Sequence, residues 1–158
     1  MSGGFHAAFR SLFPRRAAAA DVVPRVRGPI AWERPEPLLF RLDGRRDYLL
    51  KLDATLVNRS ARALDILEAD VAGTPAIWDA PRVEWMENDS IRRAVFRVEP
   101  WLPCTLDAGT RRGQVRLLFV VPRDRVASRG TARLPLVLHG DPFGTLRFEV
   151  RAEAPGDV

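Results

Sequence analysis

The feature that most constrains this 158-residue chain is an alternation of apolar and polar residues that begins near Leu38 and continues to the C-terminus. In "YLLKLDATLVN" every second residue from Leu50 to Leu56 is apolar, whereas the residues between them are polar. Because successive side chains of a strand point to opposite faces of its sheet, this pattern predicts strands that bury one face. The chain is therefore predicted to be all-β.

About eight such runs follow one another, separated by polar turns such as "NRSAR" and "NDS", and no stretch of comparable length has helical periodicity. Parallel strands need crossover helices between them, so the predicted sheets are antiparallel. Regular turn spacing without an internal repeat favours a two-sheet sandwich, with a small closed barrel as the alternative. In "QVRLLFVV" both faces are largely apolar, which predicts a central strand buried on both sides.

The segment "LPCTLDAGTRRGQVRLLFVVP" resembles bacterial immunoglobulin-like domains, in which a proline-bounded turn leads into a long buried strand. The resemblance implies a bacterial source and an immunoglobulin-like sandwich. We place this sandwich in residues 31–155 and an N-terminal arm, helical or extended, in residues 1–30.

The last two runs, "RLPLVLH" and "TLRFEVRAE", are predicted to form a hairpin. In the "GDPFG" between them, Asp141, Pro142 and Gly144 occupy the first, second and fourth positions of a type I turn. Phe148 alternates with charged residues and is predicted to face the core. Pro135 lacks a backbone donor, which predicts that the first strand of the hairpin is an edge strand.

His139 precedes this turn, and we interpret it as a hairpin residue rather than a general base. A catalytic triad needs a nucleophile and an orienting carboxylate beside the histidine, and the chain has no G-x-S-x-G motif. His6, His139 and Cys104 are too few for a zinc site. The strand acids alternate with arginines and are interpreted as a solvated, salt-bridged face. We therefore predict a non-enzymatic protein without catalytic residues, metal or cofactor.

The N-terminal arm carries most of the net charge. Residues 1–30 contain five arginines and one acid, which gives +4 of the total +5 and leaves +1 for residues 31–158. In "SGGFHAAFRSLFPRRAAAADVV" the aromatic residues share one face of a helix and arginines flank them. The residues predicted to contact a partner or membrane are Phe5, Phe9, Arg10, Leu12, Phe13, Arg15 and Arg16.

An aromatic and basic arm of this kind suits a groove in a protein partner or an anionic membrane surface. We therefore expect an assembly subunit of a larger protein complex, with peripheral membrane contact as a second mode. A body close to neutral has no basic surface that follows a phosphate backbone, so no specific nucleic-acid binding is expected. The single cysteine and the absence of a long apolar run favour the cytoplasm, or its membrane periphery.

The alternative function is a ligand-binding β-domain. "RLDGR" followed by "NRSARA" resembles the paired arginine and D/N-x-S-x-x-G motifs of PilZ domains, although Ala63 stands where that family has glycine. The resemblance implies binding of a cyclic dinucleotide. Carbohydrate is the other ligand considered, because two tryptophans lie in proline-flanked loops and such rings stack on sugars. The residues of this alternative site are Arg41, Arg45, Asn58, Ser60, Trp78 and Trp101.

Overall fold

The structure is a computed structural model that describes residues 20–44, 46–126 and 129–155. The arm residues proposed for partner contact, from Phe5 to Arg16, lie outside the described residues, as does Arg45. The described residues form eleven strands and one short 3-10 helix, η1 (Arg123–Arg125). The strands are β1 (Asp21–Pro24), β2 (Ile30–Leu42), β3 (Tyr48–Asn58), β4 (Leu64–Val71), β5 (Thr74–Pro75), β6 (Arg82–Glu87), β7 (Ser90–Val95), β8 (Cys104–Leu106), β9 (Arg111–Val121), β10 (Thr131–Asp141) and β11 (Gly144–Glu153).

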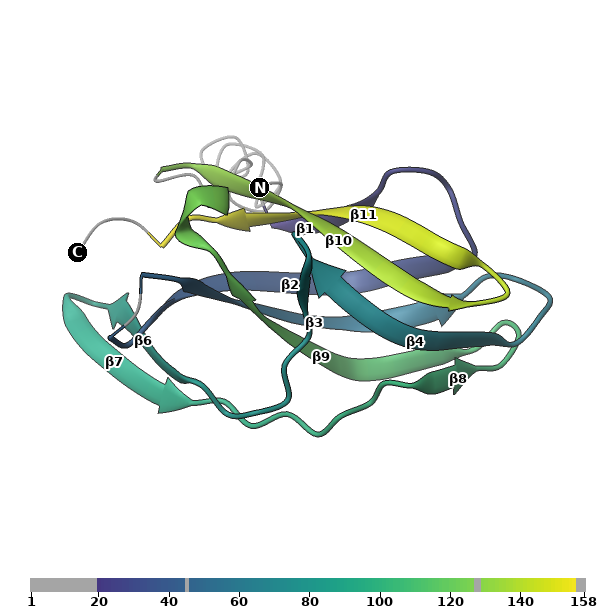
Figure 1. Cartoon of the computed structure of the whole chain (residues 1–158), viewed down its shortest axis with the longest axis horizontal. Helices are drawn as coiled ribbons and strands as arrows, with labels where there is room; N and C mark the ends of the chain where they lie inside the picture. Colours follow the sequence, from purple (N-terminus) through teal and green to yellow (C-terminus); the bar gives the residue numbers. More distant parts are fainter. Residues whose placement is uncertain (1–19, 45, 127–128, 156–158) are drawn as a thin grey trace, which may run out of the picture.

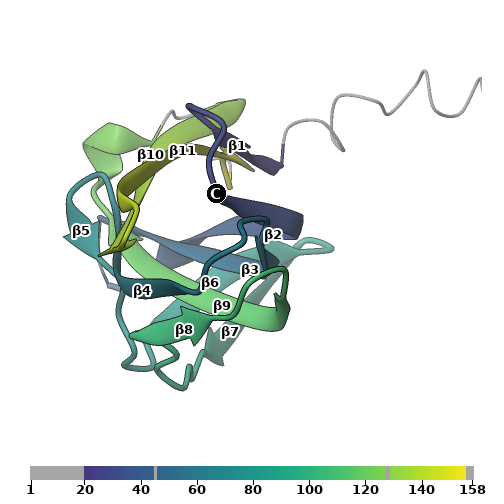
Figure 2. The ribbon, with the colours of Figure 1, turned by 90° about the vertical axis from the view of Figure 1, so that its right-hand side faces the viewer.

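These strands form two antiparallel sheets that face each other (Figure 1; Figure 2). One sheet has the order β1-β11-β10-β4-β5, with β8 paired to the other half of β4. The second sheet has the order β7-β6-β2-β3-β9. The predicted arrangement of two antiparallel sheets packed as a sandwich is confirmed. The two sheets do not close into a barrel, which was the alternative. The short strands β1, β5 and β8 raise the number of strands above the eight predicted.

Strand β1 lies in the region that the sequence pattern assigns to the arm. It pairs with β11, from Asp21 opposite Arg151 to Pro24 opposite Phe148, and it buries Val22 in the core. The sandwich therefore includes residues that precede position 31. Four residues are too few to show an alternating pattern, which is why the sequence does not reveal this strand.

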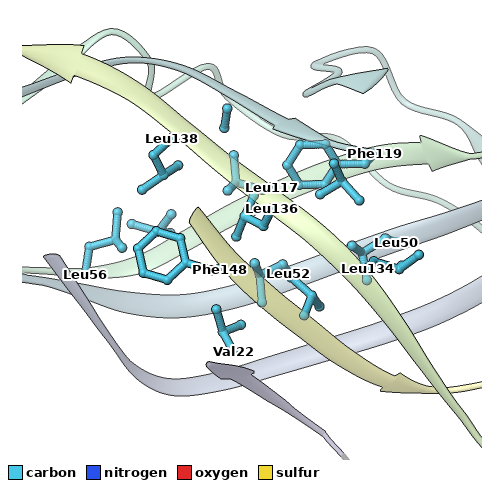
Figure 3. Packing of buried hydrophobic residues seen from close by; sticks show 14 of the residues in the cluster. Val22, Leu50, Leu52, Leu56, Leu117, Phe119, Leu134, Leu136, Leu138 and Phe148 are labelled. Atoms are coloured by element: carbon cyan, nitrogen blue, oxygen red, sulfur yellow. The ribbon is translucent and has the colours of Figure 1, made fainter. Parts of the chain in front are cut away.

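The main core lies between the two sheets and follows the predicted alternation. All four alternating apolar residues of β3, from Leu50 to Leu56, are buried. Phe148 of β11 is 3% exposed, and its ring packs edge-on against Trp32 of β2, with 5.8 Å between the ring centroids. Side chains of both sheets meet around Phe148 (Figure 3). The core therefore joins the two layers rather than belonging to either.

A second, smaller apolar cluster lies on the outer face of the second sheet. Its buried members are Leu42, Leu49, Val83 and Leu118, and partly buried aromatic side chains of Phe40, Trp85 and Phe96 pack against them. Phe96 follows the end of β7 at Val95, so the cluster includes residues beyond the strands of the sheet. The cluster covers the face of β3 and β9 that points away from the main core.

This second cluster corrects the prediction for β9. From Val115 to Val121 the strand is largely buried on both faces, as predicted, but it lies at the end of the sheet rather than at its centre. Apolar side chains cover its outer face, and the Ile77 amide donates to the Leu118 carbonyl along its free edge at 2.8 Å. An edge strand under a second apolar layer has the same sequence pattern as a central strand.

The C-terminal hairpin forms as predicted, with two corrections. Strand β10 lies between β11 and β4, so it is not an edge strand. The Pro135 carbonyl accepts the Ala72 amide just beyond the end of β4, and the two backbone groups of a residue point to the same side of a strand. An N–H group at position 135 would therefore have pointed past the end of β4, where that strand offers no acceptor. Proline at this position thus removes no hydrogen bond between β10 and β4. The peptide bond before Pro142 is cis, which the predicted type I turn did not include.

Candidate functional site

The structure does not bring Arg41 close to Asn58 and Ser60, the other described residues of the PilZ-like pattern. Strands β2 and β3 pair so that Arg41 lies opposite Tyr48 and Asn58 lies opposite Ile30. Arg41 and Asn58 are therefore at opposite ends of this hairpin, about 33 Å apart at about 3.3 Å per residue. Ser60 lies in the turn that follows Asn58. A single ligand of nucleotide size cannot contact both ends.

Asn58 is fully buried and its side chain is used by the fold. Its amide donates to the carbonyl oxygens of Arg62 at 2.7 Å, Leu106 at 2.9 Å and Asp107 at 3.2 Å. Its oxygen accepts the Ser60 amide at 2.9 Å and the Ser60 hydroxyl at 2.7 Å. Asn58 therefore ties the turn after β3 to the end of β8, and no donor or acceptor is left for a ligand.

The two loop tryptophans line different clefts. Trp101 is 8% exposed, and its Nε1–H donates to the Arg116 carbonyl at 3.1 Å. Trp78 packs against the main core and lines a cleft of about 420 Å³ together with Asp70 and Leu102. The two rings do not form a common stacking platform for a sugar.

His139 has partners that the sequence did not reveal. Its Nε2 lies 2.8 Å from Asp70 Oδ2, and its Nδ1 lies 3.5 Å from the Thr145 hydroxyl. The pairing of β10 with β4 and β11 brings these groups together, although Asp70 is 69 positions away in the chain. A hydroxyl, an imidazole and a carboxylate in this order are also the groups of a catalytic triad. However, the distance from the Thr145 hydroxyl to His139 Nδ1 is longer than the roughly 2.6–3.2 Å expected between a nucleophile and its base.

We expect His139→Gln to leave the fold and any binding activity nearly unchanged. The His139 and Asp70 side chains are 41% and 25% exposed, and solvent screening limits exposed pairs to about 1 kcal/mol or less. Urea unfolding of both proteins checks this value. A purified protein that turns over a substrate, and loses that activity in His139→Gln with its fold intact, would contradict the prediction that the protein is not an enzyme.

The first candidate site is the free edge of β7. Strands β6 and β7 form a hairpin at one end of the second sheet (Figure 1), and no described strand pairs with the other side of β7. The Phe96 amide reaches the Pro81 carbonyl on the β6 side at 3.4 Å. Backbone groups alternate in direction along a strand, so those of Ile91, Arg93 and Val95 point to the free side.

The free edge of β7 also carries exposed apolar side chains. Ile91 and Val95 are 53% and 52% exposed, and Met86, which pairs with Ile91 across the hairpin, is 42% exposed. Between them the Arg93 guanidinium lies 3.2 Å from the Glu84 carboxylate. This face of the hairpin is therefore an apolar strip with one exposed ion pair at its centre.

The second candidate site is a cleft of about 590 Å³ between residues 97–101 and the first half of β9. We call it the β9 cleft. At its floor the Asp53 carboxylate of β3 accepts two bonds from Arg116, at 2.7 and 3.1 Å, and lies 3.1 Å from the Lys51 ammonium group. Burial alone would raise the pKa of the Asp53 carboxyl, but these cations hold the pKa below its ordinary value. The floor therefore keeps one negative charge between two positive ones.

Arg112 forms one wall of the β9 cleft. Its guanidinium carbon lies 5.7 Å from the centre of the Trp101 ring, within the range of a cation–π contact. The Cys104 thiol lies close to Arg112, which lowers its pKa, but burial has the larger effect and raises it. A partly buried thiol with a raised pKa is a poor nucleophile, so Cys104 is not proposed as a reactive group.

No family model matches the chain, and no curated protein is significantly similar to it. We therefore infer a function from the two candidate sites. In the part of the chain that the structure describes, no helix has the length and apolar character needed to cross a bilayer. Across residues 20–44, 46–126 and 129–155, no three side chains of His, Cys, Asp or Glu gather as metal ligands would.

Sequence reasoning missed both candidate sites, for different reasons. The edge position of β7 depends on the order of strands in the sheet, which alternation does not encode. The β9 cleft depends on a bulge, because β9 shifts register against β3 and places Gly113 and Gln114 opposite Thr55. The signal available was "RRGQ", where a glycine interrupts a strand pattern and indicates a bulge.

Proposed function

We propose that this protein is a non-enzymatic interaction module, built on an immunoglobulin-like sandwich, that binds an extended segment of a protein partner along β7. The observation that carries the proposal is the unpaired edge of β7, with outward backbone groups at Ile91, Arg93 and Val95. An extended peptide that adds to a sheet edge gains backbone hydrogen bonds, and alternate side chains give selectivity.

The other sheet edges are less suited to such pairing. Along β9 the carbonyl oxygens of Arg116 and Leu118 already accept the Trp101 indole and the Ile77 amide. Strands β1 and β5 are four and two residues long, whereas β7 has six. Long, apolar, unprotected edges are the ones that attract another strand.

The charge of β7 favours an acidic partner segment. Residues 90–95 of β7, "SIRRAV", contain two arginines and no acid. If the partner were a second copy, its β7 would pair antiparallel with this β7 around the central residues Arg92 and Arg93. An arginine of one copy would then lie opposite an arginine of the other. Like charges directly opposite each other destabilise a strand pair, whereas opposite charges stabilise it. The segment that fits best alternates acidic and apolar residues.

The arm is a second proposed contact, and this part rests on the sequence alone. We propose that Phe5, Phe9 and Phe13 add apolar contact with the same partner, or with an anionic membrane surface, while the arginines add attraction. A cytoplasmic assembly subunit with two contact regions would hold its partner more tightly than either region alone.

The proposal is tested with a synthetic ten-residue peptide in which glutamate alternates with valine, titrated into labelled protein and followed by backbone amide signals. We expect larger shifts at the outward amides of Ile91, Arg93 and Val95 than at Arg92 and Ala94. A peptide with lysine in place of glutamate is expected to bind at least about tenfold more weakly, because like charges then face each other.

A matched pair of variants separates backbone pairing from side-chain charge. Arg93→Ala and Arg93→Pro both remove the ion pair with Glu84, but only proline removes the outward amide. We expect Arg93→Ala to retain peptide binding and Arg93→Pro to lose it. Equal binding by the two variants would overturn the proposal. So would a dimer of the unmodified protein that Arg93→Pro dissociates, since the occupant of β7 would then be a second copy.

A further inference from the structure

The β9 cleft has more positive than negative charge available to a ligand. Three arginines and two acids line it. Asp53 is shared between Arg116 and Lys51, so its charge is already balanced. Among the described residues, neither Arg97 nor Arg112 takes part in the ion pairs found, and Glu99 is the one remaining acid of the lining. The guanidinium groups of Arg97 and Arg112 and the carboxylate of Glu99 therefore remain to interact with a ligand.

The backbone of β9 is shaped to form this cleft. Gln114 has a φ of 55°, in the left-handed region that non-glycine residues rarely adopt. The bulge puts Gly113 and Gln114 opposite a single residue of β3 and places both in the lining. Bulges commonly re-aim side chains next to functional sites. Gln114 adds a neutral hydrogen-bond donor to the two guanidinium groups.

The lining of the β9 cleft combines fixed polar groups with apolar side chains. Trp101 donates its indole N–H to the Arg116 carbonyl, and the Arg112 guanidinium lies over the Trp101 ring. Val98 and Pro100 add apolar surface to the lining. Ligand sites of small molecules have volumes of about 300–1,000 Å³ and combine apolar walls with a few fixed polar groups, and the β9 cleft meets both conditions.

We propose that the β9 cleft binds a small organic phosphate, with its phosphate group between Arg97 and Arg112 and its apolar part against Val98 and Pro100. Guanidinium groups recognise phosphate by paired, charge-assisted hydrogen bonds, and two of them match a phosphate dianion. This site is separate from the free edge of β7, so the proposed partner binding and this ligand binding can fail independently.

The probe is phenyl phosphate, titrated into the full chain by isothermal calorimetry with tryptophan fluorescence as a second signal. Inorganic phosphate lacks the apolar part, and benzoate replaces the dianion with a single charge. We expect phenyl phosphate to bind at least about tenfold more tightly than either, since both the apolar wall and the second guanidinium contribute. Equal affinity for phenyl phosphate and inorganic phosphate, or for phenyl phosphate and benzoate, would overturn the assignment.

Three variants and a control locate the site. Arg97→Gln and Arg112→Gln should each weaken phenyl phosphate binding about tenfold or more, whereas Glu99→Gln should strengthen it by removing the competing charge. Arg125→Gln, in η1 beyond the far end of β9, is the matched control and should have no effect. Urea unfolding shows whether Arg112→Gln is still folded, and Arg97→Gln, which is exposed, tests the site without that concern.

The outcomes decide between a built site and general attraction to a basic chain. Weakening by Arg125→Gln equal to that by Arg97→Gln would show non-specific attraction and overturn the proposal. No phenyl phosphate binding at millimolar concentration, or weaker binding by Glu99→Gln, would overturn it as well. These results leave the test of β7 unaffected, because the glutamate peptide and the phosphate probe address different strands.

Discussion

Phe148→Ala is expected to lower the free energy of unfolding by about 3–5 kcal/mol, the usual cost of truncating a buried phenylalanine. The Phe148 ring is almost fully buried and packs edge-on against Trp32 of the opposite sheet. Its removal therefore leaves a cavity between the two layers and also removes an aromatic contact that joins them. A domain with a total stability of about 5–15 kcal/mol would lose a large share of it.

Urea unfolding of the full chain measures this loss, and Arg147→Ala on the same strand is the control. Arg147 is exposed and precedes Phe148, so its side chain points to the other face of β11. We expect its substitution to change the stability by about 0.5 kcal/mol or less. A loss of under about 1 kcal/mol in Phe148→Ala would contradict the placement of this face in the core.

Asn58→Ala is expected to cost about 2–5 kcal/mol, because it removes a buried network rather than a single bond. The variant removes the Asn58 amide from the carbonyl oxygens of Leu106 and Asp107, of which Asp107 keeps its bonds from Thr110. Asn58→Asp is the sharper test. A carboxylate has the same shape but cannot donate, and it would face three carbonyl oxygens in place of the amide.

Thermal and urea unfolding at neutral pH compare these variants with Ser60→Ala, which loses the Ser60 hydroxyl bonds but keeps the Asn58 amide. We expect Ser60→Ala to lose about 1 kcal/mol and Asn58→Asp to lose at least as much as Asn58→Ala. A stable Asn58→Asp protein would show that the amide is not committed to the fold.

The sequence was sufficient for the parts of the fold that depend on local alternation. Leu50 to Leu56, Leu134 to Leu138 and Phe148 face the core because period two fixes which face of a strand is apolar. It was not sufficient for strands β5 and β8, which are too short to show a period. The edge position of β9 was also missed, because a strand covered by a second cluster is as apolar as a central one.

The surroundings of the functional side chains depend on contacts between distant parts of the chain. They were therefore harder to predict from the sequence than the strands were. His139 was placed correctly beside a turn, but its partner Asp70 comes from another strand of the sheet. The distance between Arg41 and Asn58 of the PilZ-like pattern was hidden from the sequence for a related reason. Short motifs specify residue types, whereas the pairing of β2 with β3 decides that Arg41 and Asn58 lie at opposite ends.

The second apolar cluster makes the β6–β7 hairpin a unit with its own stability. Strand β6 pairs with β2 only at Arg41 and Leu42, so side-chain packing by Trp85, rather than a long ladder, holds the hairpin to the body. Proteins open in cooperative units of unequal free energy, and units with little backbone pairing open first. The hairpin can therefore detach while the main core stays folded. Substitutions in this cluster would therefore change how the free edge of β7 is exposed without altering the main core, so this edge can diverge on a constant scaffold.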